Sequence, residues 1–156
     1  DSTNPNSEVS TLQEILYKAK ESFGIEGILH GGILSEFQRK RFASICENLN
    51  VKLVSPLWKK NQKEYMQNLL KENFHFIIIS VSAGGLDESW LGKEITQEDL
   101  KKLEALSEKY GFNLSFEGVE AETLVTDCPL FSNPIKIKNT TNKYSILMSL
   151  FILFTL

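Results

Sequence analysis

The chain contains few of the side chains that form disulfide bonds or bind transition metals. Its 156 residues include two cysteines and two histidines. Cys46 and Cys128 are too few for a disulfide framework, and neither has a histidine or a second cysteine beside it at the spacing of zinc ligands. His30 and His75 are equally isolated along the chain. The sequence therefore predicts neither a disulfide-stapled fold nor a zinc site of histidine and cysteine ligands.

An excess of positive charge and a long apolar segment are also lacking. The 17 lysines and arginines are outnumbered by 20 aspartates and glutamates, which gives a net charge of −3. This balance offers no electrostatic footprint for nonspecific binding of nucleic acid. No apolar run reaches the roughly 20 residues of a membrane span, and the first residues do not match a signal peptide. We expect a cytoplasmic protein that contacts neither nucleic acid nor membrane directly.

What the sequence does contain is an alternation of helical and strand patterns. Apolar residues at helical spacing predict helices over residues 11–23, 35–49, 62–72 and 97–110. Short apolar runs between them predict strands over residues 25–30, 51–55, 76–81 and 112–116. This alternation is typical of α/β architecture with parallel strands. The unbroken apolar run of residues 76–81 is expected in the middle of the sheet.

Capping residues mark where these helices are predicted to begin and end. Two pairs match the capping box, in which each side chain bonds the other residue's backbone N–H: Thr11 with Glu14, and Ser35 with Gln38. Thr96 is expected to cap the last helix, which should stop at Gly111, as the first should stop at Gly24.

The end of the chain, from Tyr144 to Leu156, is almost wholly apolar. It is too short for a membrane span, and its pattern does not separate a helix from a strand. A truncated or frame-shifted reading, or a buried strand, explains it better than a membrane anchor.

Three glutamates crowd one short segment: Glu117, Glu120 and Glu122. If the segment is extended, Glu120 and Glu122 share a face and Thr123 points away from them. Crowded carboxylates repel one another, so a metal ion, a cationic ligand or arginines usually offset them. The alternative is a solvated acidic turn.

A second candidate site begins at Gly31-Gly32, between a predicted strand and the helix that opens at Ser35. Such a turn can aim backbone N–H groups at an anion, although a plain tight turn is the simpler reading. Arg39 and Arg41 lie in the first two turns of the helix, where a positive charge opposes the helix dipole. This placement indicates a bound anion, whereas Lys40 fits a solvated face.

Three blocks of sequence together resemble the diphthine–ammonia ligases, which are ATP-dependent amidases of the PP-loop group. The first is Glu117-Gly118-x-Glu120-x-Glu122-Thr123-Leu124-Val125-x-Asp127-x-Pro129-Leu130-Phe131. The second runs from Gly31-Gly32 through Ser35-Glu36-Phe37-Gln38-Arg39-Lys40-Arg41 to Cys46-Glu47 and Pro56-Leu57-Trp58. The third is Gly85-Leu86-Asp87-Glu88-Ser89-Trp90-Leu91-Gly92. The family usually has a glycine where Val119 stands and an aromatic residue where Ala121 stands.

The resemblance implies a fold and a division into domains. We expect residues 1–58 to be the carboxy-terminal part of a HUP-type, Rossmann-like ATP-binding domain with a parallel sheet. Residues 59–138 would form a smaller α/β domain on the substrate side, and residues 139–156 would be an atypical apolar tail.

The activity implied is the amidation of diphthine to diphthamide on elongation factor 2. A carboxylate is adenylated at the expense of ATP, with Mg²⁺ as cofactor, and ammonia then displaces AMP. The resemblance assigns catalysis to the three glutamates, and nucleotide or substrate binding to Gly31, Gly32, Ser35, Gln38, Arg41, Trp90 and Thr123. Trp90, with some of the glutamates, would hold the quaternary ammonium group of diphthine, since aromatic faces and carboxylates bind such cations.

One family motif is missing, the Ser-Gly-Gly-x-Asp-Ser loop that wraps the ATP phosphates. We therefore expect a truncated chain that does not bind ATP productively by itself. The alternative is a non-catalytic module, descended from this family, that docks a translation factor.

Overall fold

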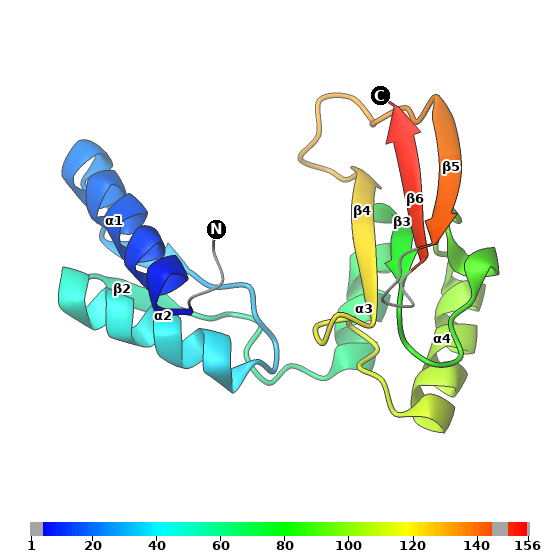
Figure 1. Cartoon of the computed structure of the whole chain (residues 1–156), viewed down its shortest axis with the longest axis horizontal. Coiled ribbons are helices and arrows are strands. Elements are labelled where there is room, and N and C mark those ends of the chain that lie inside the picture. Colours follow the sequence, from blue (N-terminus) through cyan, green and yellow to red (C-terminus); the bar gives the residue numbers. More distant parts are fainter. Residues whose placement is uncertain (1–4, 145–149, 156) are drawn as a thin grey trace. The chain divides into compact units, whose positions relative to one another are not determined.

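The computed structural model describes residues 5–144 and 150–155, with side chains described for residues 9–138. The chain divides into two compact units, Asp1–Lys59 and Lys60–Leu156 (Figure 1). Together they form an α/β protein with one short parallel sheet and one antiparallel sheet. Within the described part of the chain, no helix is both long and apolar enough to cross a bilayer.

The first unit contains two helices and two short strands. In chain order these are α1 (Pro5–Phe23), β1 (Gly27–Leu29), α2 (Glu36–Leu49) and β2 (Lys52–Val54). β1 and β2 pair in parallel, as the sequence predicted, with Ile28 opposite Leu53. Ile28 is buried, as are Ile45, Cys46 and Leu49 on the inner side of α2.

The predicted start of the first helix is wrong, whereas its end is confirmed. α1 begins at Pro5, so Thr11 lies inside the helix and does not form the predicted capping box with Glu14. Proline is favoured in a first helical turn because its missing N–H is not needed there. The helix ends at Gly24, whose φ of +62° is the left-handed conformation that suits glycine.

α2 confirms the second predicted helix and half of its predicted box. The Ser35 side chain accepts a 3.4 Å hydrogen bond from the backbone N–H of Gln38, but no reciprocal bond is formed. At the other end Asn50 adopts a left-handed conformation, and its N–H reaches the carbonyls of Cys46 and Glu47.

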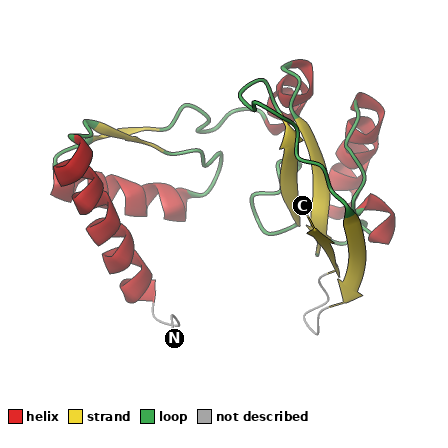
Figure 2. Cartoon of the chain, turned by 90° about the horizontal axis from the view of Figure 1, so that it is seen from above, coloured by secondary structure: helices red, strands yellow, loops and turns green. Residues whose placement is uncertain are grey.

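The second unit is a layer of helices against a four-stranded sheet. Its elements are α3 (Gln62–Lys71), β3 (His75–Val81), η1 (Glu88–Trp90), α4 (Gln97–Tyr110), β4 (Ala121–Asp127), β5 (Asn139–Tyr144) and β6 (Leu150–Thr155). The strand order is β4-β3-β6-β5 and every pair is antiparallel. α3 and α4 cover one face of the sheet (Figure 2). Part of the apolar tail is thus a strand, while residues 145–149 and 156 lie outside the described residues.

The predicted parallel pairing of residues 76–81 is wrong, and so is the predicted strand over 112–116. After α4 the chain turns instead of extending, because Phe116 and Val119 adopt positive φ values of 59° and 69°. The next strand therefore begins at Ala121 and runs opposite to β3. The alternating apolar residues of this segment are nevertheless buried, namely Phe112, Leu114 and Phe116.

β3 is an inner strand, as predicted, and supplies much of the core. A register irregularity between Ile78 and Ser80 leaves Ile79 as an extra residue. As a result Phe76, Ile78 and Val81 all join the same hydrophobic cluster. The helices contribute Met66, Leu100 and Leu103, and the loop after α4 adds Phe112, Leu114 and Phe116.

The ends of α4 are confirmed as predicted, at Thr96 and Gly111. Thr96 and Asp99 form a complete capping box, in which each side chain bonds the other residue's backbone N–H. Asp99 is buried and also pairs with the Lys93 ammonium group. The end of the helix is a left-handed glycine, as at α1.

Candidate functional site

In the first unit, a cavity of about 380 Å³ opens where β1 ends and α2 begins. It gathers most of the residues that the sequence assigned to nucleotide or substrate binding. The lining residues are Val9, Leu12, His30, Gly31, Gly32, Gln38, Arg41 and Phe42. Ser35 is not among them, and its hydroxyl caps α2.

His30 is the lining residue that the sequence analysis did not identify. Its backbone N–H continues the strand pairing with a 2.8 Å bond to the Val54 carbonyl. The imidazole is 5% exposed and lies 4.9 Å, between ring centroids, from Phe42. Nδ1 has no hydrogen-bond partner among the residues that the structure describes. The available signal was position: a polar ring directly between a strand and two glycines.

Gly32 has a specific steric reason to be glycine. A Cβ built on it would lie 2.4 Å from Cε1 of His30, which is far inside contact distance. By contrast, a Cβ at Gly31 would meet nothing within 4 Å. Only the second glycine is therefore required for the imidazole ring to pack against the backbone.

The two arginines of α2 differ in their surroundings. The Arg41 guanidinium lies 3.8 Å from the ring centroid of Phe37 and reaches the cavity, whereas Arg39 lies 5.0 Å from the Trp58 ring and does not line it. The cavity therefore combines one cation, one side-chain amide and a glycine turn. This donor set suits an anionic group.

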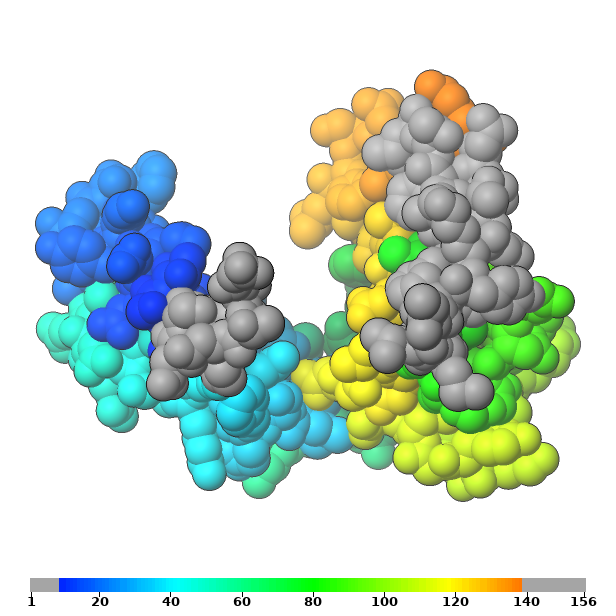
Figure 3. Space-filling view, in the orientation of Figure 1, coloured from blue at the N-terminus to red at the C-terminus, as the bar shows by residue number. Residues whose placement is uncertain are grey.

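In the second unit, the glutamate segment connects the loop after α4 to β4. It belongs to the surface stretch coloured yellow in Figure 3. Glu120 does not extend into solvent but turns back over the loop. Its Oε1 accepts bonds from the backbone N and Nδ2 of Asn113, at 3.1 and 2.7 Å, and its Oε2 accepts one of 2.5 Å from the Gly118 N–H. Three donors on one carboxylate close the loop into a fixed turn.

Gln62, at the start of α3, fastens the same loop to the helix layer. Its Oε1 accepts hydrogen bonds from the backbone N and the hydroxyl of Ser115, at 3.0 and 3.1 Å. Its Nε2 donates a 3.4 Å bond to Oδ1 of Asn113. Glu120 and Gln62 thus both fasten the loop, and Asn113 bonds to each of them.

Glu117 is close enough to act electrostatically on Tyr65 of α3. Burial raises the pKa of the Tyr65 hydroxyl, and the negative charge of Glu117 raises it further. Next to Tyr65 is a cavity of about 210 Å³. It is lined by Tyr65, Met66, Leu69, Phe74, Phe76, Ser115, Phe116, Thr123 and Val125.

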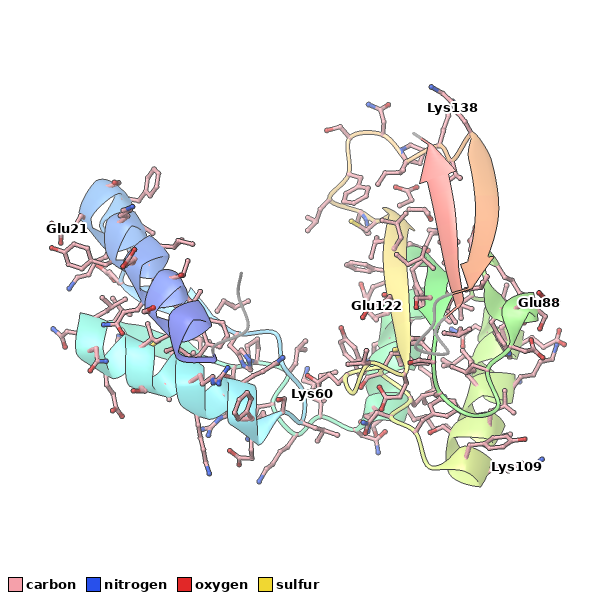
Figure 4. The ribbon with its side chains drawn as sticks, in the orientation of Figure 1. Glu21, Lys60, Glu88, Lys109, Glu122 and Lys138 are labelled. Atoms are coloured by element: carbon pink, nitrogen blue, oxygen red, sulfur yellow. The ribbon has the colours of Figure 1, made fainter. Side chains whose placement is uncertain are left out.

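The three glutamates differ in environment. Glu117 and Glu120 are half-buried, whereas Glu122 is exposed on β4 (Figure 4). Because strand residues alternate between faces, Glu122 lies on the face opposite Thr123, which lines the cavity. The structure therefore does not bring all three carboxylates to one point.

Trp90 lies in the hydrophobic core. It is 8% exposed and belongs to the hydrophobic cluster of the second unit. The Lys93 ammonium group lies 5.5 Å from the centroid of its ring. The aromatic residue whose pKa is raised by the charge of Glu117 is Tyr65, which was not predicted from the sequence to be a site residue.

The turn contains backbone strain at the position where the sequence departs from the family pattern. Val119 is exposed and has a φ of 69°, a conformation that costs a β-branched residue about 1–3 kcal/mol. Glycine adopts this φ without that cost. Gly118 has a steric role as well, since a Cβ there would lie 2.6 Å from Oε1 of Glu120.

Among the described residues, no three histidine, cysteine or acidic side chains lie close enough together to hold a metal ion.

Comparison with known proteins gives consistent matches. A family model described as the diphthamide synthase C-terminal domain matches residues 61–153. A diphthine–ammonia ligase of Bos taurus is 42% identical over 134 residues, which is 85% of this chain and 50% of the relative. The Homo sapiens protein of that name is 40% identical over the same shares, and that of Schizosaccharomyces pombe is 38% identical over 71% of this chain and 18% of the relative. The chain spans about half the length of the mammalian relatives.

Proposed function

The chain belongs to the family of the diphthamide synthase C-terminal domain, and on that basis we propose that it acts in the ATP-dependent amidation of diphthine to diphthamide. Its relatives are named as diphthine–ammonia ligases. The substrates would be diphthine on elongation factor 2 and ammonium, and the place of action the cytoplasm.

The observation that carries this proposal is the construction of the glutamate segment. Residues 117–123 lie inside the region matched by the family model. Glu120 and Gln62 hold the loop before this segment in one conformation, so Thr123 keeps a fixed position in the lining of the 210 Å³ cavity and Glu117 stays close enough to act on Tyr65. A preformed site of this kind lowers the ordering cost of binding a substrate.

The three glutamates would have different roles. Glu117 and Thr123 would bind the diphthine side chain. Glu122, which is exposed, would bind ammonium and take its proton, a task that suits a carboxylate acting as general base. Glu120 would position the segment rather than react. Trp90 stays a sequence-based prediction that its buried position does not support.

The 380 Å³ cavity of the first unit is the proposed nucleotide side. Gln38, Arg41 and the Gly31-Gly32 turn supply donors that fit a phosphate group. ATP would supply the activation of the carboxylate, with Mg²⁺ to neutralise its phosphates.

We further propose that residues 1–58 are the end of a HUP-type domain, that 59–138 form the substrate-side domain and that 139–156 are a separate tail.

The test is a reaction with diphthine-bearing elongation factor 2, ATP, Mg²⁺ and ammonium, run with the purified chain and with a bovine ligase in which this chain replaces the matching half, because the chain lacks the loop that wraps the ATP phosphates. The product is read by mass spectrometry as replacement of a carboxylic hydroxyl by an amino group. The bovine diphthine–ammonia ligase serves as positive control, and omission of ammonium as negative control. Amidation that depends on ammonium and is lost in Arg41→Ala and Glu122→Gln supports the proposal.

The second candidate is a non-catalytic module that binds the translation factor, favoured by the strained Val119 at the family's glycine position. Titration calorimetry separates the two functions. Binding of elongation factor 2 without binding of ATP–Mg²⁺ and without amidation identifies the module.

A further inference from the structure

His30 places a buried imidazole at the edge of the parallel strand pair of the first unit. It directly follows β1, and its backbone N–H bonds to the carbonyl of Val54, the last residue of β2. Ligands of parallel α/β sheets bind just beyond the carboxyl ends of the strands. The ring is 5% exposed, yet it lines the cavity of about 380 Å³ that opens at this edge. Its position therefore brings a polar ring against whatever occupies the cavity.

Two neighbours fix the orientation of this ring. Phe42 of α2 packs against it, with 4.9 Å between the ring centroids. An edge of the ring lies against Gly32, where a Cβ would come within 2.4 Å of Cε1 and 2.8 Å of Nε2 of His30. A ring held in this way offers its nitrogens in fixed directions, which lowers the ordering cost of binding a ligand.

The buried nitrogen of His30 decides which tautomer the neutral ring adopts. A neutral imidazole carries one N–H donor and one acceptor nitrogen. Nδ1 is buried and has no hydrogen-bond partner among the residues that the structure describes. A proton on Nδ1 would be a buried donor without an acceptor, which is rare in folded proteins. The proton therefore belongs on Nε2, the nitrogen that is left to reach the cavity.

The charges around the ring favour an anionic ligand. Arg41 is the charged side chain of the lining, and α1 contributes the apolar Val9 and Leu12. From β2, the contact with His30 is a backbone carbonyl that the His30 backbone N–H already occupies. No carboxylate is among the described lining residues, so an anion would meet no repulsion from a negative side chain there.

We propose that His30 is an anion-binding residue of this cavity, which donates a hydrogen bond to the ligand from the Nε2–H of its neutral imidazole. Arg41 would supply positive charge, and His30 a directed donor. Hydrogen bonds to an ionised acceptor are roughly twice as strong as those between neutral groups. That the natural ligand is a phosphate group of ATP rests on the proposed function, whereas the donor role rests on the cavity and the ring.

The experiment uses sulfate as the probe, at pH 8, where an imidazole is ordinarily neutral. Binding to the ¹⁵N-labelled chain is followed by NMR at the amides of Gly31 and Gly32, with chloride at equal ionic strength as the control for screening. Imidazole ¹⁵N spectra report which nitrogen of His30 carries the proton. The chain's other histidine, His75, is the reference for the opposite tautomer, because its Nδ1 bonds to the Glu94 carboxylate at 2.7 Å.

Variants of His30 separate the donor from the ring. His30→Phe keeps a ring against Phe42 but removes both nitrogens, so sulfate should bind about tenfold more weakly. His30→Gln can place an amide N–H near the position of Nε2 and should retain most of the affinity, which guards against a loss that comes from misfolding. The shorter His30→Asn should not. His75→Phe, in the second unit, is the matched control and should change nothing.

A His30 ring with its proton mainly on Nδ1 overturns the proposal. So does unchanged sulfate affinity in His30→Phe, or the absence of sulfate-specific shifts at Gly31 and Gly32. Amidation is not part of this readout. Sulfate binding that depends on His30, without amidation, would contradict the proposed function alone. Amidation together with unchanged sulfate affinity in His30→Phe would contradict this proposal alone.

Discussion

Oε1 of Glu120 accepts a 2.7 Å hydrogen bond from Nδ2 of Asn113, seven residues earlier in the chain. This contact closes the turn that presents the glutamate segment. A residue chosen from sequence as catalytic is therefore also part of the scaffold.

We predict that Glu120→Gln destabilises the chain. The glutamine amide keeps one acceptor oxygen but places an NH₂ group against a backbone or side-chain donor. Leaving such a donor unsatisfied costs about 1–3 kcal/mol, measured as the free energy of unfolding in urea. Glu122→Gln, in the same segment but exposed, is the matched control and should stay within about 0.5 kcal/mol. Full stability of Glu120→Gln would contradict the scaffold role.

Gln62→Leu should release the loop from α3. Leucine has a similar size but cannot bond Ser115 or Asn113, so two donors lose their partner. Hydrogen exchange of the Ser115 amide should accelerate strongly, with little change at the core strand β3. Gln67→Leu, on the same helix, is the comparison. Unchanged exchange at Ser115 would show that Gln62 is dispensable.

Val119→Gly should stabilise the chain by about 1 kcal/mol, because it removes a β-branched side chain from a left-handed conformation. Most glycine substitutions destabilise, so the sign is diagnostic. Val119→Ala keeps a Cβ and should recover only part of the gain. Thermal melts measure both variants, and a lower melting temperature for the glycine variant would refute the strain argument.

Gly32→Ala should destabilise the first unit by displacing the His30 ring, whereas Gly31→Ala should be tolerated. The expected cost of forcing a methyl group into this packing is about 1–3 kcal/mol. Adding His30→Ala should restore most of the loss, because the clashing ring is then absent. An additive double variant would place the clash elsewhere.

The Lys93–Asp99 pair should make stability depend on acid pH. Burial alone would raise the pKa of Asp99, but its hydrogen bonds with Lys93 and Thr96 hold that pKa below its usual value. A depressed folded pKa contributes stability that is present above the unfolded pKa, about 3.9, and is lost as pH falls through the folded value. Asp99→Asn should flatten the unfolding free energy between about pH 5 and 2. An unchanged slope would assign the acid sensitivity to other carboxylates.

Local signals predicted the parts of the fold that depend on neighbouring residues. Ser35, Thr96 and Gly111 mark helix ends in the structure where capping chemistry placed them. The direction of strand pairing could not be predicted from neighbouring residues alone. It follows from a reversal at Phe116 and Val119, two residue types that rarely adopt positive φ, so a turn in this segment was only the alternative interpretation.

The same distinction applies to the candidate sites. Gly31, Gly32, Gln38 and Arg41 could be grouped from sequence because they lie within one strand-to-helix connection. Tyr65 and Glu117 come from elements separated by more than a whole strand and helix. Their proximity depends on how α3 packs beside β4, which no short motif encodes.

The extra residue at Ile79 changes which positions of β3 point toward the helices. Before it, Phe76 and Ile78 face the helices, and after it Val81 does, so the inward positions change from even to odd numbers. A sequence alignment with a one-residue gap in this strand would exchange inward and outward positions on one side of the bulge. Any transfer of core positions between relatives therefore depends on whether they share this irregularity.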